Sequence, residues 1–491
     1  MGIYRTLFVI VMCVAIILLN PEVQADSAEF FFDQAFQAEK LQNLDQALAL
    51  LNKAAELDPR NSAVFNYRGV IFSKKKEYDQ AIIDYDQALS LSPENAGTYN
   101  NRGLAYQQKG DFQRALRDYD RALDLDKMNL EALYNRALLM EKTGSTSQPI
   151  ADLKTLLAID DRNIEARVLL GRLHLAEASP DEALKIFSAT LRLAPDTVEA
   201  MRGMGDANFL KRRFDRAVED YSRALNVQQH DPSTLINRCA TFILMGEFED
   251  AIRDCEEGLK FDPGCPDGFF NLGNALAAAG KDREATEAFD VAIRLNPERA
   301  DYYYNRGISF WKLGSSENAI KDFTKVLETN PSHAHALNNK GMILWASGNI
   351  QAAIEDMNRA AELDDKNVGV LTNLGAAYLA VGLSDKAIHV FEKALRISPK
   401  NPDIAKGIGD AWMEKKRLDR ALLFYKKSLE KETDREKKSQ IHVRIGHAWE
   451  WSRNTDKAIR SYMSALESTG DPSKGDSLRG KINELKSRPK R

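Results

Sequence analysis

The strongest constraint on this chain is a 34-residue period that runs through most of its length. Alanine, or in one case proline, recurs at the same place in twelve consecutive periods, and a thirteenth alanine, Ala458, follows a three-residue insertion. A fixed period of this length indicates one supersecondary unit repeated along the chain. The twelve positions are residues 47, 81, 115, 149, 183, 217, 251, 285, 319, 353, 387 and 421.

Each period predicts two amphipathic helices. In the ninth period, residues 300–333, the side chains of Tyr303, Gly307 and Phe310 lie at i, i+4 and i+7, and the same apolar spacing recurs sixteen residues later. Gly314 separates the two helices, because glycine is the usual residue after a helix end. One pair of helices cannot bury its apolar faces alone, so neighbouring pairs must stack into a continuous core.

These features resemble the tetratricopeptide repeat (TPR) family. The eighth residue of each period is Ala, Gly or Cys, as in Gly273 and Gly307, and proline ends seven of the periods. The resemblance implies an all-α fold, a right-handed α-solenoid superhelix of about 13 helix-turn-helix units. It also implies that the first helix of each unit lines a concave groove.

The two ends of the chain differ from the repeats. Repeats occupy residues 28–435 and 439–472, and beyond them Leu478, Ile482 and Leu485 lie at i, i+4 and i+7, which predicts a capping helix. The stretch 426–491 carries 17 Lys or Arg against 10 Asp or Glu. The predicted organisation is a signal peptide at 1–25, a TPR superhelix at 26–472, and a capping helix with a basic tail at 473–491.

The N-terminal residues predict export. Arg5 precedes an apolar run of 13 residues, Leu7 to Leu19, which is short for a membrane-spanning helix and typical of a signal-peptide core. The small side chains before Asp26 favour cleavage between Ala25 and Asp26. An uncleaved N-terminal membrane anchor is the alternative. Both interpretations place the body of the protein outside the cytoplasm, and the bacterial periplasm fits best.

The chain's own repeats allow an internal comparison of charges. Arg or Lys occupies the seventh position of six repeats, and in all six the residue sixteen places later is aspartate. This co-occurrence predicts an ion pair between the two helices of one repeat, so the recurring Asn-Arg-Gly string does not indicate a phosphate site. Met204 with Asp220 is the exception. The six predicted pairs are Arg68–Asp84, Arg102–Asp118, Arg136–Asp152, Arg238–Asp254, Arg306–Asp322 and Lys340–Asp356.

Asparagine recurs at the sixth position, which TPR superhelices turn toward the groove. Its amide both donates and accepts hydrogen bonds, which suits the backbone of an extended peptide. The run resembles the asparagine ladder in the TPR superhelix of O-linked N-acetylglucosamine transferase; inheritance from duplicated repeats is the alternative. Trp311 and Trp345, at the twelfth position, are candidate apolar anchors or packing residues. The candidate binding asparagines are Asn101, Asn135, Asn237, Asn271, Asn305, Asn339 and Asn373.

The sequence contains no pattern that indicates catalysis. No CxxC motif and no metal-ligand spacing occur, so neither a cofactor nor a metal is expected. Cys239 and Cys255 are either two buried thiols or a disulfide. The net charge of −4 argues against nucleic acid.

These observations favour a non-enzymatic exported scaffold that binds a protein or an extended peptide in its groove, in cell-envelope assembly, secretion or polysaccharide export. The alternative is a structural assembly protein that uses its outer faces, with its basic C-terminus contacting a membrane or an anionic partner.

Overall fold

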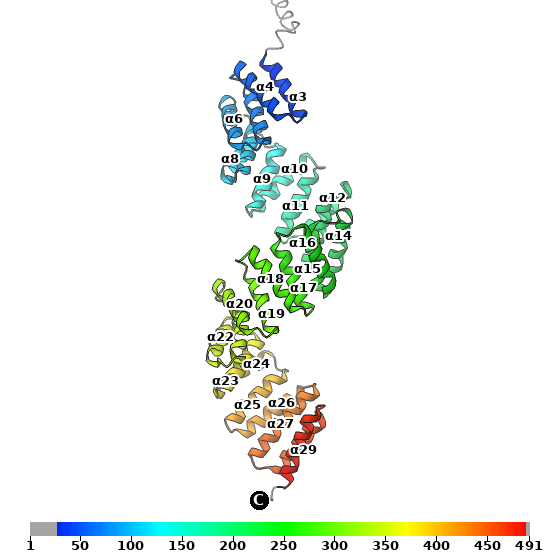
Figure 1. Cartoon of the computed structure of the whole chain (residues 1–491), viewed down its shortest axis with the longest axis vertical. Coiled ribbons are helices and arrows are strands. Elements are labelled where there is room, and N and C mark those ends of the chain that lie inside the picture. The colour runs from blue at the N-terminus through cyan, green and yellow to red at the C-terminus, as the bar shows by residue number, and fades with distance from the viewer. Residues whose placement is uncertain (1–26, 488–491) are drawn as a thin grey trace, which may run out of the picture. The chain divides into compact units, whose positions relative to one another are not determined.

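The protein is an all-α helical repeat solenoid. The computed structural model describes residues 27–487, and in this range it contains 27 helices, α3 to α29, and no strand (Figure 1). The predicted signal peptide and its cleavage site at Ala25–Asp26 lie outside the described residues. No helix between residues 27 and 487 is both long and apolar enough to cross a membrane.

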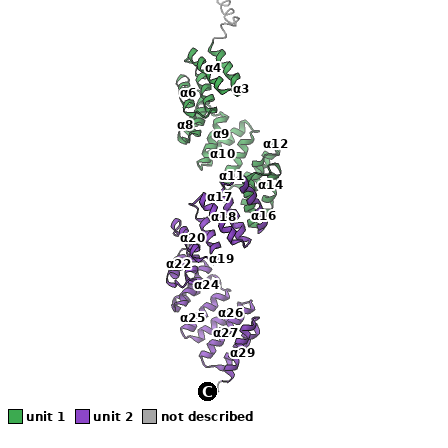
Figure 2. Cartoon of the chain, in the orientation of Figure 1, with its two compact units in different colours: residues 1–245 green, residues 246–491 purple. Residues whose placement is uncertain are grey.

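The chain divides into two compact units, residues 1–245 and 246–491 (Figure 2). In the first unit, the first helix of each repeat is called helix A and the second helix B. Helices A are α3 (Ala28–Lys40), α5 (Ser62–Lys74), α7 (Ala96–Gln108), α9 (Leu130–Lys142), α11 (Ile164–Ala176), α13 (Val198–Leu210) and α15 (Pro232–Met245). Helices B are α4 (Leu44–Leu57), α6 (Tyr78–Leu91), α8 (Phe112–Leu125), α10 (Ser147–Ile159), α12 (Pro180–Leu193) and α14 (Phe214–Val227).

The second unit begins with a helix B and ends with a helix that has no partner helix B. Its helices A are α17 (Pro266–Ala278), α19 (Ala300–Lys312), α21 (Ala334–Ala346), α23 (Val368–Ala380), α25 (Pro402–Glu414) and α27 (Arg435–Trp451). Its helices B are α16 (Phe248–Phe261), α18 (Asp282–Leu295), α20 (Ser316–Thr329), α22 (Ile350–Leu363), α24 (Ser384–Ile397), α26 (Leu418–Lys431) and α28 (Thr455–Ser468), and the last helix is α29 (Pro472–Ser487).

Helices A and B of one repeat approach closely because a small residue meets an aromatic ring. A Cβ atom added to Gly69 would lie 2.6 Å from Cε1 of Tyr85 on the following helix B. Phe187 sits between two helices A, since added Cβ atoms at Gly171 and Gly203 would lie 2.4 and 2.3 Å from its ring. The small eighth position is therefore a packing requirement.

The predicted ion pairs connect more helices than expected. Arg306 donates from Nε and Nη2 to the Asp322 carboxylate at 2.8 and 2.6 Å, and its Nη1 reaches Asp290 of the preceding helix B at 2.5 Å. One arginine therefore joins three helices. Five of the six predicted pairs lie within one unit, and all five are formed: Arg68–Asp84, Arg102–Asp118, Arg136–Asp152, Arg306–Asp322 and Lys340–Asp356.

The exception to the pairing rule has its own partner. Where Met204 replaces the cation, the Asn208 side chain donates to Asp220 at 2.8 Å, and both residues are buried. A neutral donor on helix A therefore takes the place of the cation, and Arg223 of the same helix B lies 3.4 Å from the other carboxylate oxygen.

The end of the second unit is closed by α29. Leu478, Ile482 and Leu485 are 8%, 6% and 2% exposed and pack against α28, as the apolar spacing predicts. On the other side of α29, a Cβ added to Gly480 would meet nothing within 4 Å. The helix therefore covers the last repeat and presents a polar face to solvent, which makes it a cap.

Candidate functional site

The candidate asparagines lie on the face of helices A that points away from helix B of the same repeat, which we call the A face. Position eight packs against helix B, and position six lies almost on the opposite side of a helix with 3.6 residues per turn. All seven candidate asparagines are half-buried.

In the first unit the asparagine amides connect successive helices A. Asn101 Nδ2 donates to Asn66 Oδ1 at 3.2 Å, and Asn135 Nδ2 donates to Asn100 Oδ1 at 3.0 Å. Each hydrogen bond spans 35 residues, from the sixth position of one repeat to the fifth position of the repeat before it. These bonds hold the amides in a fixed orientation across the A face.

In the first unit, the Asn237 amide has a carboxylate as its hydrogen-bond acceptor in place of another amide. Asn237 Nδ2 donates to Asp206 Oδ1 at 2.9 Å, and the hydroxyl of Tyr221 donates to the same oxygen at 2.7 Å. The pKa of Asp206 is raised, because the effect of burial outweighs the opposite effect of these two donors and of the nearby Arg202. The two donors fix one carboxylate oxygen of Asp206 on the A face.

The second unit repeats the arrangement. Asn305 Nδ2 donates to Asn274 Oδ1 at 2.7 Å, and Asn373 Nδ2 donates to Asn338 Oδ1 at 3.0 Å. Asn339 Nδ2 donates to the hydroxyl of Tyr304 at 3.3 Å. The partner is again at the fifth or ninth position of the preceding helix A.

The inter-repeat bonds use only part of each amide. Between residues 27 and 487, the Oδ1 atoms of Asn101, Asn135, Asn305 and Asn373 accept no hydrogen bond from the protein. An amide oxygen has two lone pairs, so these oriented side chains retain acceptor capacity.

The partners of these asparagines were not among the predicted site residues. Their signal was present as an asparagine 35 residues, or in one repeat 31 residues, before a ladder asparagine. They are Asn66, Asn100, Asn274 and Asn338.

The ladder is interrupted for a packing reason. The sixth position of α13 is Gly203, and an added Cβ there would lie 2.3 Å from Phe187. The same position of α25 is Gly407, where an added Cβ would lie 2.7 Å from Phe391. At these two steps an aromatic ring from the preceding helix B occupies the space that an asparagine side chain would need.

The two tryptophans differ in exposure. Trp311 is 36% exposed, whereas Trp345 is half-buried and packs against the cluster that contains Ile354 and Leu371. Trp311 is therefore the more accessible of the two for an external side chain, and Trp345 contributes to the core of the second unit.

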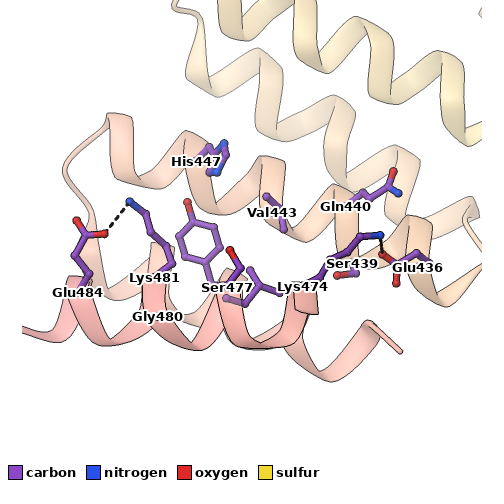
Figure 3. Close-up of a pocket in the computed structure, with 12 residues that line it drawn as sticks. Glu436, Ser439, Gln440, Val443, His447, Lys474, Ser477, Gly480, Lys481 and Glu484 are labelled. Atoms are coloured by element: carbon purple, nitrogen blue, oxygen red, sulfur yellow. Dashed lines mark hydrogen bonds and ion pairs between the residues drawn. The ribbon is translucent and has the colours of Figure 1, made fainter. Parts of the chain in front are cut away.

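A cavity of about 480 Å³ lies between α27 and α29, with Tyr462 of α28 among its lining residues. Figure 3 shows one ion pair at each end, Lys474 with Glu436 and Lys481 with Glu484, at 2.6 and 3.3 Å. Because each lysine already has a carboxylate partner, the cavity offers no uncompensated charge.

His447 of α27 is one of the residues that line this cavity (Figure 3). The pKa of His447 is lowered, mainly by burial and also by the positive charges of Arg444 and Lys481, and the carboxylate of Glu450 offsets only part of this effect. Histidine here is therefore mostly neutral at neutral pH. Within residues 27–487, no group of three His, Cys, Asp or Glu side chains is placed to hold a metal ion.

Family models match much of the chain. TPR repeat and tetratricopeptide repeat models match residues 69–110, 273–314, 168–233, 304–368, 96–129 and 379–440. A protein prenyltransferase alpha subunit repeat model matches residues 44–75, which cover one helix B and the next helix A. No curated protein matches the chain.

Solved structures with similar folds include long helical repeats. The Cut9–Hcn1 hetero-tetramer of the APC/C is 16% identical, with 93% of this chain and 96% of that chain covered and a TM-score of 0.44. A tetratricopeptide repeat protein from Parabacteroides merdae is 22% identical, and the match covers 51% of this chain and 98% of that chain with a TM-score of 0.42. Yeast Tom70 is 17% identical, with coverages of 87% and 95% and a TM-score of 0.35.

Proposed function

The chain belongs to the tetratricopeptide repeat family, whose members are protein-interaction scaffolds, and we propose that it is a non-enzymatic, exported scaffold whose A face binds a protein or an extended peptide. Candidate settings are cell-envelope assembly, secretion and polysaccharide export. The observation that carries the proposal is the set of oriented amides. Each is held by one inter-repeat hydrogen bond and retains an acceptor oxygen.

Pre-orientation is what makes these amides suitable for binding. A free asparagine side chain loses rotamer freedom when it grips a ligand, whereas an amide already held by its neighbour does not lose it again. A peptide backbone presents one N–H group at each non-proline residue, and that group can donate to Oδ1 whatever the side chain. The proposed site therefore recognises backbone in an extended segment.

The export part of the proposal rests on residues 1–25. Their single basic residue, short apolar run and small side chains before Asp26 support cleavage after Ala25. The intact mass of the protein recovered from its native cells tests this step. A mass that starts at Asp26 is expected, and recovery with Met1 retained would favour the anchored alternative.

Photo-crosslinking tests the binding surface. We expect benzoylphenylalanine at Trp311, an exposed side chain of the helix A α19, to cross-link a protein partner in native cells. The matched control is the same group at Lys321 on α20, whose side chain is 67% exposed. Cross-links only from Lys321 would move the binding site to the outer faces.

A second variant separates binding from folding. The double variant Asn305→Ala with Asn373→Ala removes two of the proposed hydrogen bonds to the ligand backbone, each worth about 0.5–1.5 kcal/mol. The affinity for the partner should fall by roughly 5- to 150-fold, and the yield of the cross-link from Trp311 should fall with it. An unchanged cross-link in a folded double variant would contradict the role of the amides.

A further inference from the structure

The helix α3 is the first of the first unit (Figure 1), and its outer side is exposed where every later helix A is covered. In the second to the thirteenth repeat, the third and tenth positions of helix A are buried, because the preceding helix B packs there, as Tyr119 does against Leu139. In α3 the same positions are Phe30, which is 36% exposed, and the exposed Gln37. Residues 27–487 therefore leave room on α3 for one more helix.

The first repeat differs from the last in the polarity of this outer side. A terminal repeat needs a polar outer face to stay soluble by itself, and α29 gives the last repeat such a face. The outer side of α3 instead carries Phe30 and Leu41, and Leu41 is 81% exposed. This inference rests on the proposed function, since cleavage after Ala25 leaves only Asp26 and Ser27 ahead of α3. Two residues are too few to cover the apolar side chains.

Four exposed residues form one line along this side of α3: Phe30, Gln34, Gln37 and Leu41, which we call the end stripe. Their spacings of four, three and four residues keep them on one side of a helix with 3.6 residues per turn. The stripe has the same order of apolar and amide side chains from either end. When two such helices pack antiparallel, Phe30 of each therefore meets Leu41 of the other, and Gln34 of each meets Gln37 of the other. Glutamine amides both donate and accept, so the central pairs form hydrogen bonds.

The charges beside the end stripe favour the same antiparallel arrangement. Glu29, Asp33 and Lys40 are exposed and lie along one edge of the stripe, with the two carboxylates near the start of α3 and the lysine at its end. Antiparallel packing places Lys40 of each copy beside Glu29 and Asp33 of the other, whereas parallel packing would oppose like charges. In the single chain, Lys40 Nζ lies 4.5 Å from the centre of the neighbouring Phe36 ring, an exposed contact that an ion pair replaces at little cost.

We propose that the mature chain forms a two-fold symmetric dimer in which the end stripes of two α3 helices pack antiparallel. The same surface serves both copies, as in other isologous interfaces. Because each copy contributes essentially one helix, the interface is smaller than the roughly 800 Å² per partner of a stable complex. The dimer is therefore reversible, and we expect a dissociation constant of about 10–100 µM.

Sedimentation equilibrium of the chain from Asp26 onward tests the dimer, over a protein concentration range of about 1–200 µM. Phe30→Glu and Leu41→Lys should each weaken self-association at least about tenfold, because both bury a charge against an apolar side chain. The matched control is Leu423→Lys on α26, a leucine that is 49% exposed and far from α3 in the sequence, which should leave self-association unchanged. A chain that stays monomeric throughout this range, or a dimer that Leu41→Lys does not weaken, would overturn the proposal.

A mixture of the two variants tests the orientation of the helices. In antiparallel packing, the carboxylate introduced by Phe30→Glu faces the ammonium introduced by Leu41→Lys, so an equimolar mixture should associate more tightly than either variant alone. In parallel packing the two introduced charges would lie at opposite ends of the helix pair and would not meet. Circular dichroism of each variant should match that of the unchanged chain. A mixture of folded variants that associates no better than its components would refute the antiparallel dimer.

The outcome is independent of the cross-linking experiment. That experiment uses the native partner and a probe at Trp311 in the second unit, whereas sedimentation requires only the chain itself. A monomeric chain together with a cross-link from Trp311 would remove this inference and leave the proposed function standing. A dimer without any cross-link from Trp311 would leave the inference standing and count against the proposed binding surface.

Discussion

Arg306 offers the sharpest test of how this solenoid is held together. Its guanidinium makes two hydrogen bonds to Asp322 of its own repeat and one to Asp290 of the repeat before. Asp322 is 4% exposed, while the side chains of Arg306 and Asp290 are 18% and 44% exposed. Burial disfavours the charge of Arg306, yet its two carboxylate partners raise its pKa. The variant to make is Arg306→Leu, alone and combined with Asp322→Ala.

The magnitudes follow from burial. Removing one member of a fully buried pair costs about 3–5 kcal/mol because the other charge is left without compensation. Since Arg306 keeps some exposure, we expect Arg306→Leu to cost about 2–3 kcal/mol. The double variant should cost only about 1 kcal/mol, because no buried charge remains. The chain already uses such an apolar combination in its eleventh repeat, with Leu374 and Val390.

The assay must measure the local stability of the repeat that contains Arg306, because long repeat arrays do not unfold as a single two-state unit. Hydrogen exchange of peptides from α19 and α20 gives the free energy of local opening. The double variant should recover about 1–2 kcal/mol relative to Arg306→Leu, or roughly 5- to 30-fold in protection. Arg306→Leu with Asp290→Ala is the control, since an exposed pair contributes about 0–1 kcal/mol. Additive losses for Arg306 and Asp322 would refute a direct pair.

Three further predictions concern packing, pH and the cap. Gly203→Ala should destabilise the first unit by about 1–3 kcal/mol through overlap with Phe187, whereas Gly480→Ala, with nothing within 4 Å, should be neutral or stabilising in thermal unfolding. In the folded protein the pKa of His447 lies below its ordinary value of about 6.5, because burial disfavours the charged ring. The unfolded chain therefore binds the proton more readily, so stability should fall as pH drops below about 6.5, and His447→Gln should reduce that fall in urea titrations. Ile482→Asp should detach α29 and raise hydrogen exchange in α28, and unchanged exchange would contradict its role as a cap.

Much of the fold was predictable because the chain contains its own comparison set. A period of 34 residues places each apolar residue at a known position on a helix, and thirteen copies show which residues occur together. The pairing of Arg306 with Asp322 was found in this way and is confirmed. Leu478 and Ile482 likewise predicted the apolar face of the cap from helical spacing alone.

The candidate site was predictable only in part. The sixth-position asparagines were identified from their recurrence, but the recurrence of asparagine 35 or 31 residues earlier does not reveal that the two amides bond, because that depends on how one repeat packs on the next. Trp311 and Trp345 occupy equivalent positions, yet one is exposed and the other packs into the core. The difference arises because packing against the neighbouring repeat, and not the position in the helix, sets the exposure of a large side chain.

The amino-acid sequence therefore determined the helices, the repeat and the ion pairs within one repeat, because all of these depend on spacing along one or two adjoining helices. Tertiary structure decided the contacts between repeats: the reach of Arg306 to Asp290, the choice of Asn274 as partner of Asn305, and the insertion of Phe187 against Gly203. These contacts depend on the offset and angle at which one repeat packs on the next, which the summed packing of many side chains sets and no single spacing specifies.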